Sequence, residues 1–187
     1  SGRPSPTKAE HVIEDLNGKI DMIIDGGQSD VGLESTIIDV SSDDVCLLRP
    51  GGITVPMIEA VVGDISIDKA VIGPMAEGEK PKAPGMKYRH YAPKAELTIV
   101  SGDLAKVQYK INRLASVDVF NGRKVGVIAT DESMGAYPGT LTKSIGKRSD
   151  KNAVAHNLFN VLREFDRDGV DVIYSEAFDV DPEKVLP

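Results

Sequence analysis

The chain has 187 residues, of which 41% are hydrophobic and 27% charged, and its formal net charge at pH 7 is −7. This length allows one large domain or two small ones, and the acidic balance argues against tight non-specific binding of nucleic acid, which requires neutralisation of phosphates. No apolar run approaches the roughly 18 residues that span a bilayer, and Cys46, the single cysteine of the sequence, fits a protein of the reducing cytoplasm.

The first part of the chain mixes helix and strand signals. Thr7 and Glu10 form a capping-box pattern, and the apolar residues that follow recur at helical spacing until Gly18. Short apolar runs between turn residues predict strands over residues 20–24, 35–40 and 45–48, followed by a helix over residues 56–62 that Thr54 caps.

In the second part, apolar strands alternate with amphipathic helices. We expect strands over residues 97–100, 125–129 and 170–174 and helices over residues 104–114 and 153–165. This alternation favours a parallel sheet covered on both faces, which is a small Rossmann-like α/β domain. No GxGxxG sequence follows its first strand, so a dinucleotide is not indicated. Because the proline-rich residues 73–94 lack periodicity, we predict that they link a domain at residues 1–72 to one at residues 95–187.

Three short segments carry side chains suited to polar ligands. Ser5 lies at an expected helix N-terminus, where hydroxyl and N–H groups attract phosphate or carboxylate oxygens, although a plain helix cap is the alternative. Ser35 and Thr36 place adjacent hydroxyls at a strand entrance, yet both are also ordinary strand residues. Arg49 ends an apolar strand before a Pro-Gly-Gly turn, and its planar fork suits phosphate, with a surface salt bridge as the alternative.

Residues 84–93, PGMKYRHYAP, hold the highest density of recognition side chains. Lys87, Tyr88, His90 and Tyr91 stand together between prolines, in a segment that is not helical. Loops between rigid elements are where binding groups collect. We therefore interpret this segment as part of a binding site.

Motifs for metal binding or nucleophilic catalysis are absent from the sequence. The histidines do not have the HExxH spacing, and neither a GxSxG elbow nor a Walker A motif occurs. His11 and His156 fall in predicted helices, where we interpret them as packed or surface residues. We assign no catalytic side chain and no metal ligand.

Taken in order, SGRPSPTKAEHV, DGG followed by GLESTIID, LRPGG and APGMKYRHYAP resemble the two-domain L-threonylcarbamoyl-AMP synthases of bacteria and archaea. The resemblance implies part of a YrdC-like twisted mixed sheet with helices, joined to a Rossmann-like parallel α/β domain. It also implies a nucleotidyltransferase that converts L-threonine, bicarbonate and ATP, with Mg2+, into threonylcarbamoyl-AMP and pyrophosphate. A threonylcarbamoyl-transfer complex then uses this product for the t6A modification of tRNA.

The same resemblance assigns roles to individual residues. It implies that Ser35, with Thr36 beside it, holds L-threonine, and that Ser5 and Arg49 contact ATP. The aromatic and basic residues of the linker are expected to close over the nucleotide site, with His90 and Tyr91 foremost and Tyr88 and Lys87 behind them.

Family members carry further sheet and ligand contacts upstream of the segment that matches Ser1. We therefore expect this chain to hold the C-terminal part of the YrdC-like domain, an incomplete catalytic site and exposed apolar surface in residues 1–72. A non-catalytic nucleotide- or RNA-binding module is the alternative function. The net charge of −7 counts against RNA.

Overall fold

The computed structural model describes residues 3–73, 82 and 91–178. Within this described part, the chain divides into two compact units. Residues 3–32 and 91–178 form the larger unit, and residues 33–73 with Lys82 belong to the smaller unit.

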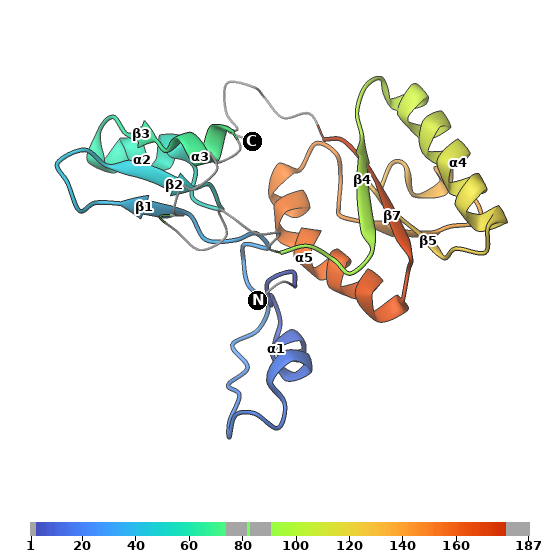
Figure 1. The fold of residues 1–187 in the computed structure, drawn as a ribbon, viewed down its shortest axis with the longest axis horizontal. Coiled ribbons are helices and arrows are strands. Elements are labelled where there is room, and N and C mark those ends of the chain that lie inside the picture. The colour runs from blue at the N-terminus through green and yellow to red at the C-terminus, as the bar shows by residue number, and fades with distance from the viewer. Residues whose placement is uncertain (1–2, 74–81, 83–90, 179–187) are drawn as a thin grey trace. The chain divides into compact units, whose positions relative to one another are not determined.

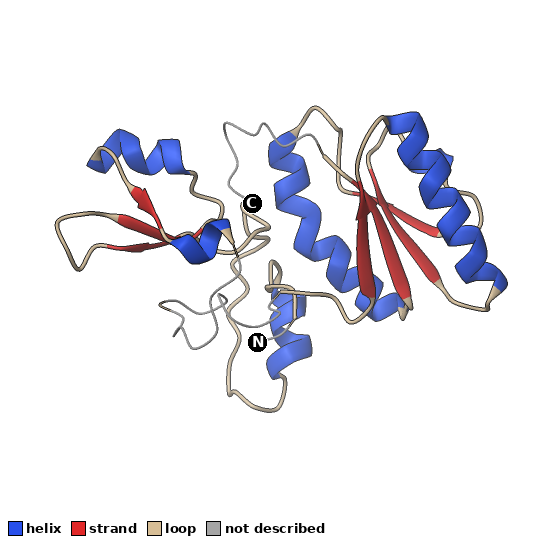
Figure 2. Cartoon of the chain, turned by 45° about the horizontal axis from the view of Figure 1, so that its top comes forward, coloured by secondary structure: helices blue, strands red, loops and turns tan. Residues whose placement is uncertain are grey.

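The larger unit is built on a four-stranded parallel sheet with strand order β4-β7-β5-β6. Its helices α4 and α5 lie on opposite faces of this sheet (Figures 1 and 2). The elements of this unit are α1 (Ala9–Leu16), β4 (Glu96–Val100), α4 (Leu104–Phe120), β5 (Val125–Ala129), the short 3-10 helix η1 (Met134–Ala136), β6 (Leu141–Ser144), α5 (Lys151–Asp168) and β7 (Val172–Glu176). The predicted Rossmann-like parallel sheet is thus confirmed.

The buried strand β5 shows why this sheet is apolar on both faces. Val127 packs in the cluster with α4, whereas the next residue, Ile128, packs in the cluster with α5. Successive side chains of a strand point to opposite faces, so a strand covered on both sides reads as a continuous apolar run. Gly126 lies so close to α5 that an added Cβ would be 2.8 Å from the Phe165 ring.

The smaller unit carries a three-stranded mixed sheet with strand order β1-β2-β3. Strands β1 and β2 are antiparallel, and β2 and β3 are parallel. Its elements are β1 (Ile37–Asp39), β2 (Cys46–Arg49), α2 (Val55–Val62), β3 (Ser66–Ile67) and α3 (Lys69–Ile72). Leu47, Leu48 and Ile58 are buried, but several apolar side chains are exposed, as expected from the sequence: Val40, Ile53, Met57, Val61 and Ile72.

The strand predicted over residues 20–24 is not formed. None of the described strands pairs with this segment, and Ile24 is 86% exposed. An apolar run becomes a strand only where a neighbour satisfies its backbone groups. The predicted capping box is also wrong, because the residue at the N-cap of α1 is Lys8, which makes no side-chain cap bond, whereas Thr7 is buried.

The structure also differs from the prediction in the length of one helix and in four additional elements. Helix α4 runs to Phe120, six residues beyond the predicted end at Leu114, because its buried stripe continues through Ala115 and Asp118. Four elements were not predicted, namely β3, α3, η1 and β6. Strand β6 has the sequence LTKS and lacks an apolar run, so only its pairing with β5 makes it a strand.

Candidate ligand-binding site

In the smaller unit, Arg49 at the end of β2 contacts Ser35, which precedes β1. Its Nε and one terminal nitrogen donate to the Ser35 carbonyl at 3.0 and 2.8 Å, and that terminal nitrogen also donates to Ser35 Oγ at 2.9 Å. Two residues that the sequence singled out separately are thus in direct contact. Their hydroxyl and guanidinium groups form a polar, positively charged pair suited to an anionic ligand.

The turn that follows Arg49 explains this arrangement. An added Cβ on Gly51 would lie 2.4 Å from both the Glu34 carbonyl oxygen and the Thr36 nitrogen, so only glycine allows the turn to approach so closely. The Gly52 N–H donates to the Glu34 carbonyl at 3.2 Å. Thr36 Oγ1 donates to the Ile53 carbonyl at 2.6 Å and accepts from the Ile53 N–H at 3.1 Å. The Thr36 hydroxyl therefore ties the turn to the strand entrance.

In the larger unit, the candidate segment is the turn from Pro4 to Thr7, before α1. Pro4 and Thr7 are buried, and Ser5 between them is partly exposed. The Thr7 N–H donates to His11 Nδ1 at 3.1 Å, and the Thr7 carbonyl accepts from the Ser29 N–H at 2.8 Å. The backbone around Ser5 is thus held by groups of the same unit, while Ser5 itself reaches the surface.

His11 is fully buried and serves this turn. Burial is the largest cause that lowers the pKa of His11, and the neighbouring Arg163 guanidinium lowers it further. The imidazole is therefore neutral at pH 7, and its Nδ1 stays available as the acceptor for the Thr7 N–H. This agrees with the interpretation of His11 as a packed residue.

Tyr91 lies at the start of the described C-terminal segment, with a backbone φ of 58°. Its ring stacks on Phe159 of α5 with 5.8 Å between ring centroids, against the core of the larger unit. A positive φ is unfavourable for a bulky residue, so the packing of the ring holds the backbone there. The other linker candidates, Lys87, Tyr88 and His90, lie outside the described residues.

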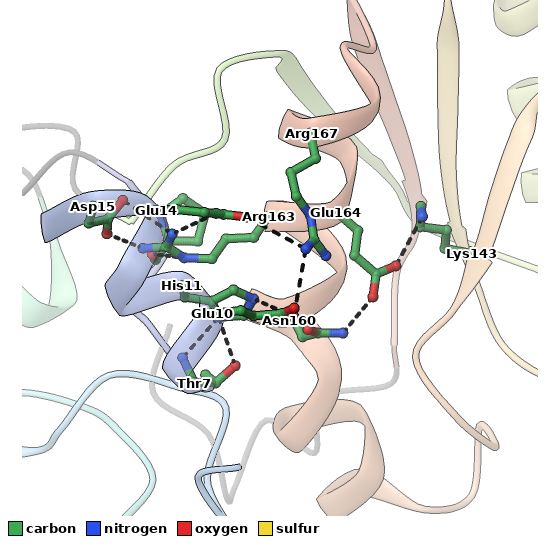
Figure 3. A network of polar contacts seen from close by, with 11 residues as sticks. Thr7, Glu10, His11, Glu14, Asp15, Lys143, Asn160, Arg163, Glu164 and Arg167 are labelled. Atoms are coloured by element: carbon green, nitrogen blue, oxygen red, sulfur yellow. Dashed lines mark hydrogen bonds and ion pairs between the residues drawn. The ribbon is translucent and has the colours of Figure 1, made fainter. Parts of the chain in front are cut away.

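Sequence reasoning missed the polar face of α5. Arg163 donates from Nε to the Pro4 carbonyl at 2.8 Å and pairs with Asp15 of α1 at 2.6 Å (Figure 3). His156, Asn160 and Arg167 lie on the same face of the helix. The spacing of these polar residues, opposite the apolar stripe, was the signal in the sequence.

Two further polar clusters are buried in the larger unit. Glu176, at the end of β7, accepts from the Tyr137 hydroxyl and pairs with Arg148. Asp118 accepts from the Tyr174 hydroxyl at 2.5 Å and pairs with Arg123 at 3.0 Å. These buried carboxylates are matched by donors, so we interpret both clusters as structural.

Among residues 3–73, 82 and 91–178, no helix has the length and apolarity needed to cross a membrane. Likewise, no three acidic, histidine or cysteine side chains of the described ranges gather as a metal site requires.

The fold and these contacts define an α/β protein with a parallel-sheet unit and a smaller unit carrying a hydroxyl–guanidinium pair. Residues 53–186 match the family described as threonylcarbamoyl-AMP synthase, C-terminal domain, and residues 1–51 match the family described as telomere recombination. The chain belongs to the threonylcarbamoyl-AMP synthase C-terminal domain family.

Relatives named threonylcarbamoyl-AMP synthase occur in all three domains of life. The chain is 47% identical to the Bacillus subtilis protein over 178 residues, 48% identical to the Pyrococcus abyssi protein over 177 and 34% identical to the Schizosaccharomyces pombe protein over 187. Each match covers 95% of this chain but 49%, 50% and 45% of the respective relative. The chain thus spans about half the length of the curated relatives it matches.

Two solved structures of the P. abyssi protein Sua5 are similar to the whole chain. The complex with L-threonine has a TM-score of 0.82 and 46% identity, and the match covers 100% of this chain and 52% of that one. A variant with a histidine and the adjacent tyrosine replaced by alanine has a TM-score of 0.83 and 45% identity, and the match covers 100% and 51% of the two chains.

Proposed function

We propose that this chain acts in the synthesis of threonylcarbamoyl-AMP from L-threonine, bicarbonate and ATP. The observation that carries the proposal is the contact between Ser35 and Arg49, within a chain 47% identical to a threonylcarbamoyl-AMP synthase. The solved complex of the similar Sua5 with L-threonine supports threonine as one substrate.

The reaction needs binding groups more than a protein nucleophile. The threonine amine attacks bicarbonate, which loses water to give a carbamate. A carbamate oxygen then attacks the α-phosphate of ATP, and pyrophosphate leaves. The protein must hold several anions together and offset their repulsion with positive and hydrogen-bonding groups.

We assign the binding roles residue by residue. The Ser35 hydroxyl holds L-threonine, and Thr36 supports it through the turn at Ile53. Arg49 and Ser5 contact the phosphates of ATP, for which the planar guanidinium and the turn before α1 are suited.

We propose that residues 73–94, which link the predicted domains at residues 1–72 and 95–187, close over the nucleotide. His90 and Tyr91 are our first candidates for this role, and Tyr88 and Lys87 are the second. His90-Tyr91 is the single His-Tyr pair of the sequence, and the Sua5 variant lacks an adjacent histidine and tyrosine. Closure would exclude water from a labile mixed anhydride.

Among the described residues, no three acidic, histidine or cysteine side chains gather into a magnesium site made by the protein alone. We propose that Mg2+ arrives with the phosphates of ATP, and we assign it no separate step. The product is proposed to pass, in the cytoplasm, to a threonylcarbamoyl-transfer complex that modifies tRNA.

Mass spectrometry tests the reaction directly. The chain, and in parallel the protein as its gene encodes it, is incubated with L-threonine, bicarbonate, ATP and Mg2+, and threonylcarbamoyl-AMP is measured. Product from either sample supports the proposal. Nucleotide or RNA binding without product from either sample would favour the non-catalytic binding module instead.

Two substitutions in the encoded protein separate the roles of the contacting pair. Arg49→Ala should weaken ATP binding more than threonine binding, and Ser35→Ala should do the reverse. Isothermal titration with each ligand measures both. Equal losses for both ligands in both variants would refute the assignment of separate roles.

A further inference from the structure

One face of α5 is devoted to the N-terminal segment of the larger unit. His156, Asn160, Arg163 and Arg167 are spaced by four, three and four residues, which places them on one side of a helix. His156 Nδ1 donates to the Asp30 carbonyl at 2.8 Å, and Arg167 pairs with Glu14 of α1 at 3.5 Å. His156, Arg163 and Arg167 thus contact residues 3–32 through directed polar bonds, whereas Asn160 donates within α5, to Glu164 at 2.8 Å.

Arg163 is the buried centre of this face. Its residue surface is 3% exposed, and its guanidinium meets both Asp15 carboxylate oxygens, at 2.6 and 3.4 Å (Figure 3). The bond from its Nε to the Pro4 carbonyl is 2.8 Å long. A fork that satisfies a carboxylate and a carbonyl at once requires arginine geometry, since lysine offers a single point charge.

The Pro4 carbonyl belongs to the peptide bond that leads into Ser5. On the other side of Ser5, His11 holds the Thr7 N–H from within α1. The turn around Ser5 is therefore held at both ends, once from its own helix and once from α5.

We propose that Arg163 is a positioning residue for the nucleotide site and that α5 sets the place of Ser5 through the Pro4 carbonyl. This inference rests on the proposed function, in which Ser5 contacts ATP. It gives α5 an indirect part in substrate binding, through Ser5 of the same unit.

The test uses the protein as its gene encodes it, with Arg163→Lys and Arg163→Met. Arg167→Lys is the matched control, because Arg167 lies one turn further along the same helix and pairs with Glu10 and Glu14 instead of the turn. Steady-state synthesis of threonylcarbamoyl-AMP gives kcat and the KM for each substrate. Hydrogen exchange of the peptide that contains residues 3–8 reports the order of the turn, and thermal unfolding shows which variants are folded.

We expect both Arg163 variants to raise the KM for ATP on the order of tenfold, because small displacements of a binding group are costly. The KM for L-threonine and kcat should change much less, and exchange in residues 3–8 should accelerate. Arg167→Lys should match the wild type. If Arg163→Met does not fold, Arg163→Lys decides.

Three results would overturn the inference while leaving the proposed function intact. They are an unchanged KM for ATP in Arg163→Lys, an equal rise of the KM for both substrates, and equal effects of Arg163→Lys and Arg167→Lys. A wild-type protein that makes no product would instead refute the proposed function, and this inference with it. Assaying the wild type first separates the two failures.

Discussion

Different interactions stabilise each of the two units internally. In the larger unit, β5 and β7 are buried along their whole length between two helices, and the ring of Phe165 fills the space above Gly126. Among the described residues of the smaller unit, only a few apolar side chains are buried, and the site depends on hydrogen bonds between backbone, hydroxyl and guanidinium groups. Apolar packing thus stabilises the larger unit, whereas close backbone approach shapes the candidate site in the smaller unit.

The larger unit also contains buried polar groups that are fixed by their hydrogen-bond partners. The larger unit buries whole carboxylates with their donors, as at Asp118 and Tyr174. Burial, and then the bond to Asp118, raises the pKa of Tyr174 to about 12. The hydroxyl therefore remains a donor at any physiological pH, and the cluster acts as fixed structure.

Removing the Phe165 ring should give the largest loss of stability. Phe165→Ala is expected to lower the free energy of unfolding by about 3–5 kcal/mol, because it deletes a fully buried ring between helix and sheet. Phe120→Ala is the matched control, since Phe120 is 91% exposed and its loss should change stability by less than about 0.5 kcal/mol. Urea unfolding measures both, and similar losses would contradict the description of this core.

In the smaller unit, truncation of a buried residue should cost less. Leu47 is 1% exposed, so Leu47→Ala removes buried methyl groups, but few other apolar side chains are buried in the described part of this unit. We expect a loss of about 2 kcal/mol, at the low end for such a change. Urea unfolding followed by hydrogen exchange in residues 46–49 locates the loss. A loss as large as that of Phe165→Ala would mean that the two cores are equally tight.

A methyl group at Gly51 should damage the site more than the fold. Gly51→Ala places its Cβ against the backbone of residues 34–36, which must then move and carry Ser35 away from Arg49. We expect L-threonine affinity to fall on the order of tenfold. Gly73→Ala is the control, because a Cβ there meets nothing within 4 Å. Titration calorimetry on the encoded protein measures the affinity of both variants for L-threonine. An unchanged affinity in Gly51→Ala would show that the turn at Gly51 does not position the threonine-binding residues.

The sequence predicted an element well where a short apolar run was clearly bounded. Strand β5 was predicted with its observed bounds, because its run of four apolar residues and Gly126 lies between turn signals. The run at residues 20–24 looked similar but forms no strand, since strand formation depends on a partner that local sequence does not specify. Strand β6 shows the converse, as pairing with β5 makes a strand of a polar segment.

The candidate site was predictable in its residue types but not in its supports. Ser35 and Arg49 stood out because hydroxyl and guanidinium groups occur at the ends of apolar strands. Arg163 did not, because it lies 159 residues from the Pro4 carbonyl that it binds, and only the fold brings them together. His11 likewise appeared as an ordinary helical histidine, although its ring accepts from the Thr7 N–H in the turn before α1.

The smallest expected effect is a pH dependence that originates at His11. Burial lowers the pKa of His11 below its usual value of 6.5, so the folded state binds fewer protons than the unfolded chain just below that pH. The contribution of neutral His11 to the free energy of unfolding is therefore fully present above the unfolded pKa, and it is lost as the pH falls through and below about 6.5. Protonation would also remove the acceptor for the Thr7 N–H.

His11→Asn tests this origin, because a neutral amide oxygen can still accept from the Thr7 N–H but does not titrate in this range. The urea midpoint is measured between about pH 7 and pH 5 for wild type and variant. The charged groups around His11 do not confuse the comparison, since Glu10, Glu14, Arg163 and Arg167 are present in both proteins. We expect the wild type to lose more stability than the variant across this range. Equal slopes would show that His11 is not the titrating group and would place the pH dependence elsewhere in the chain.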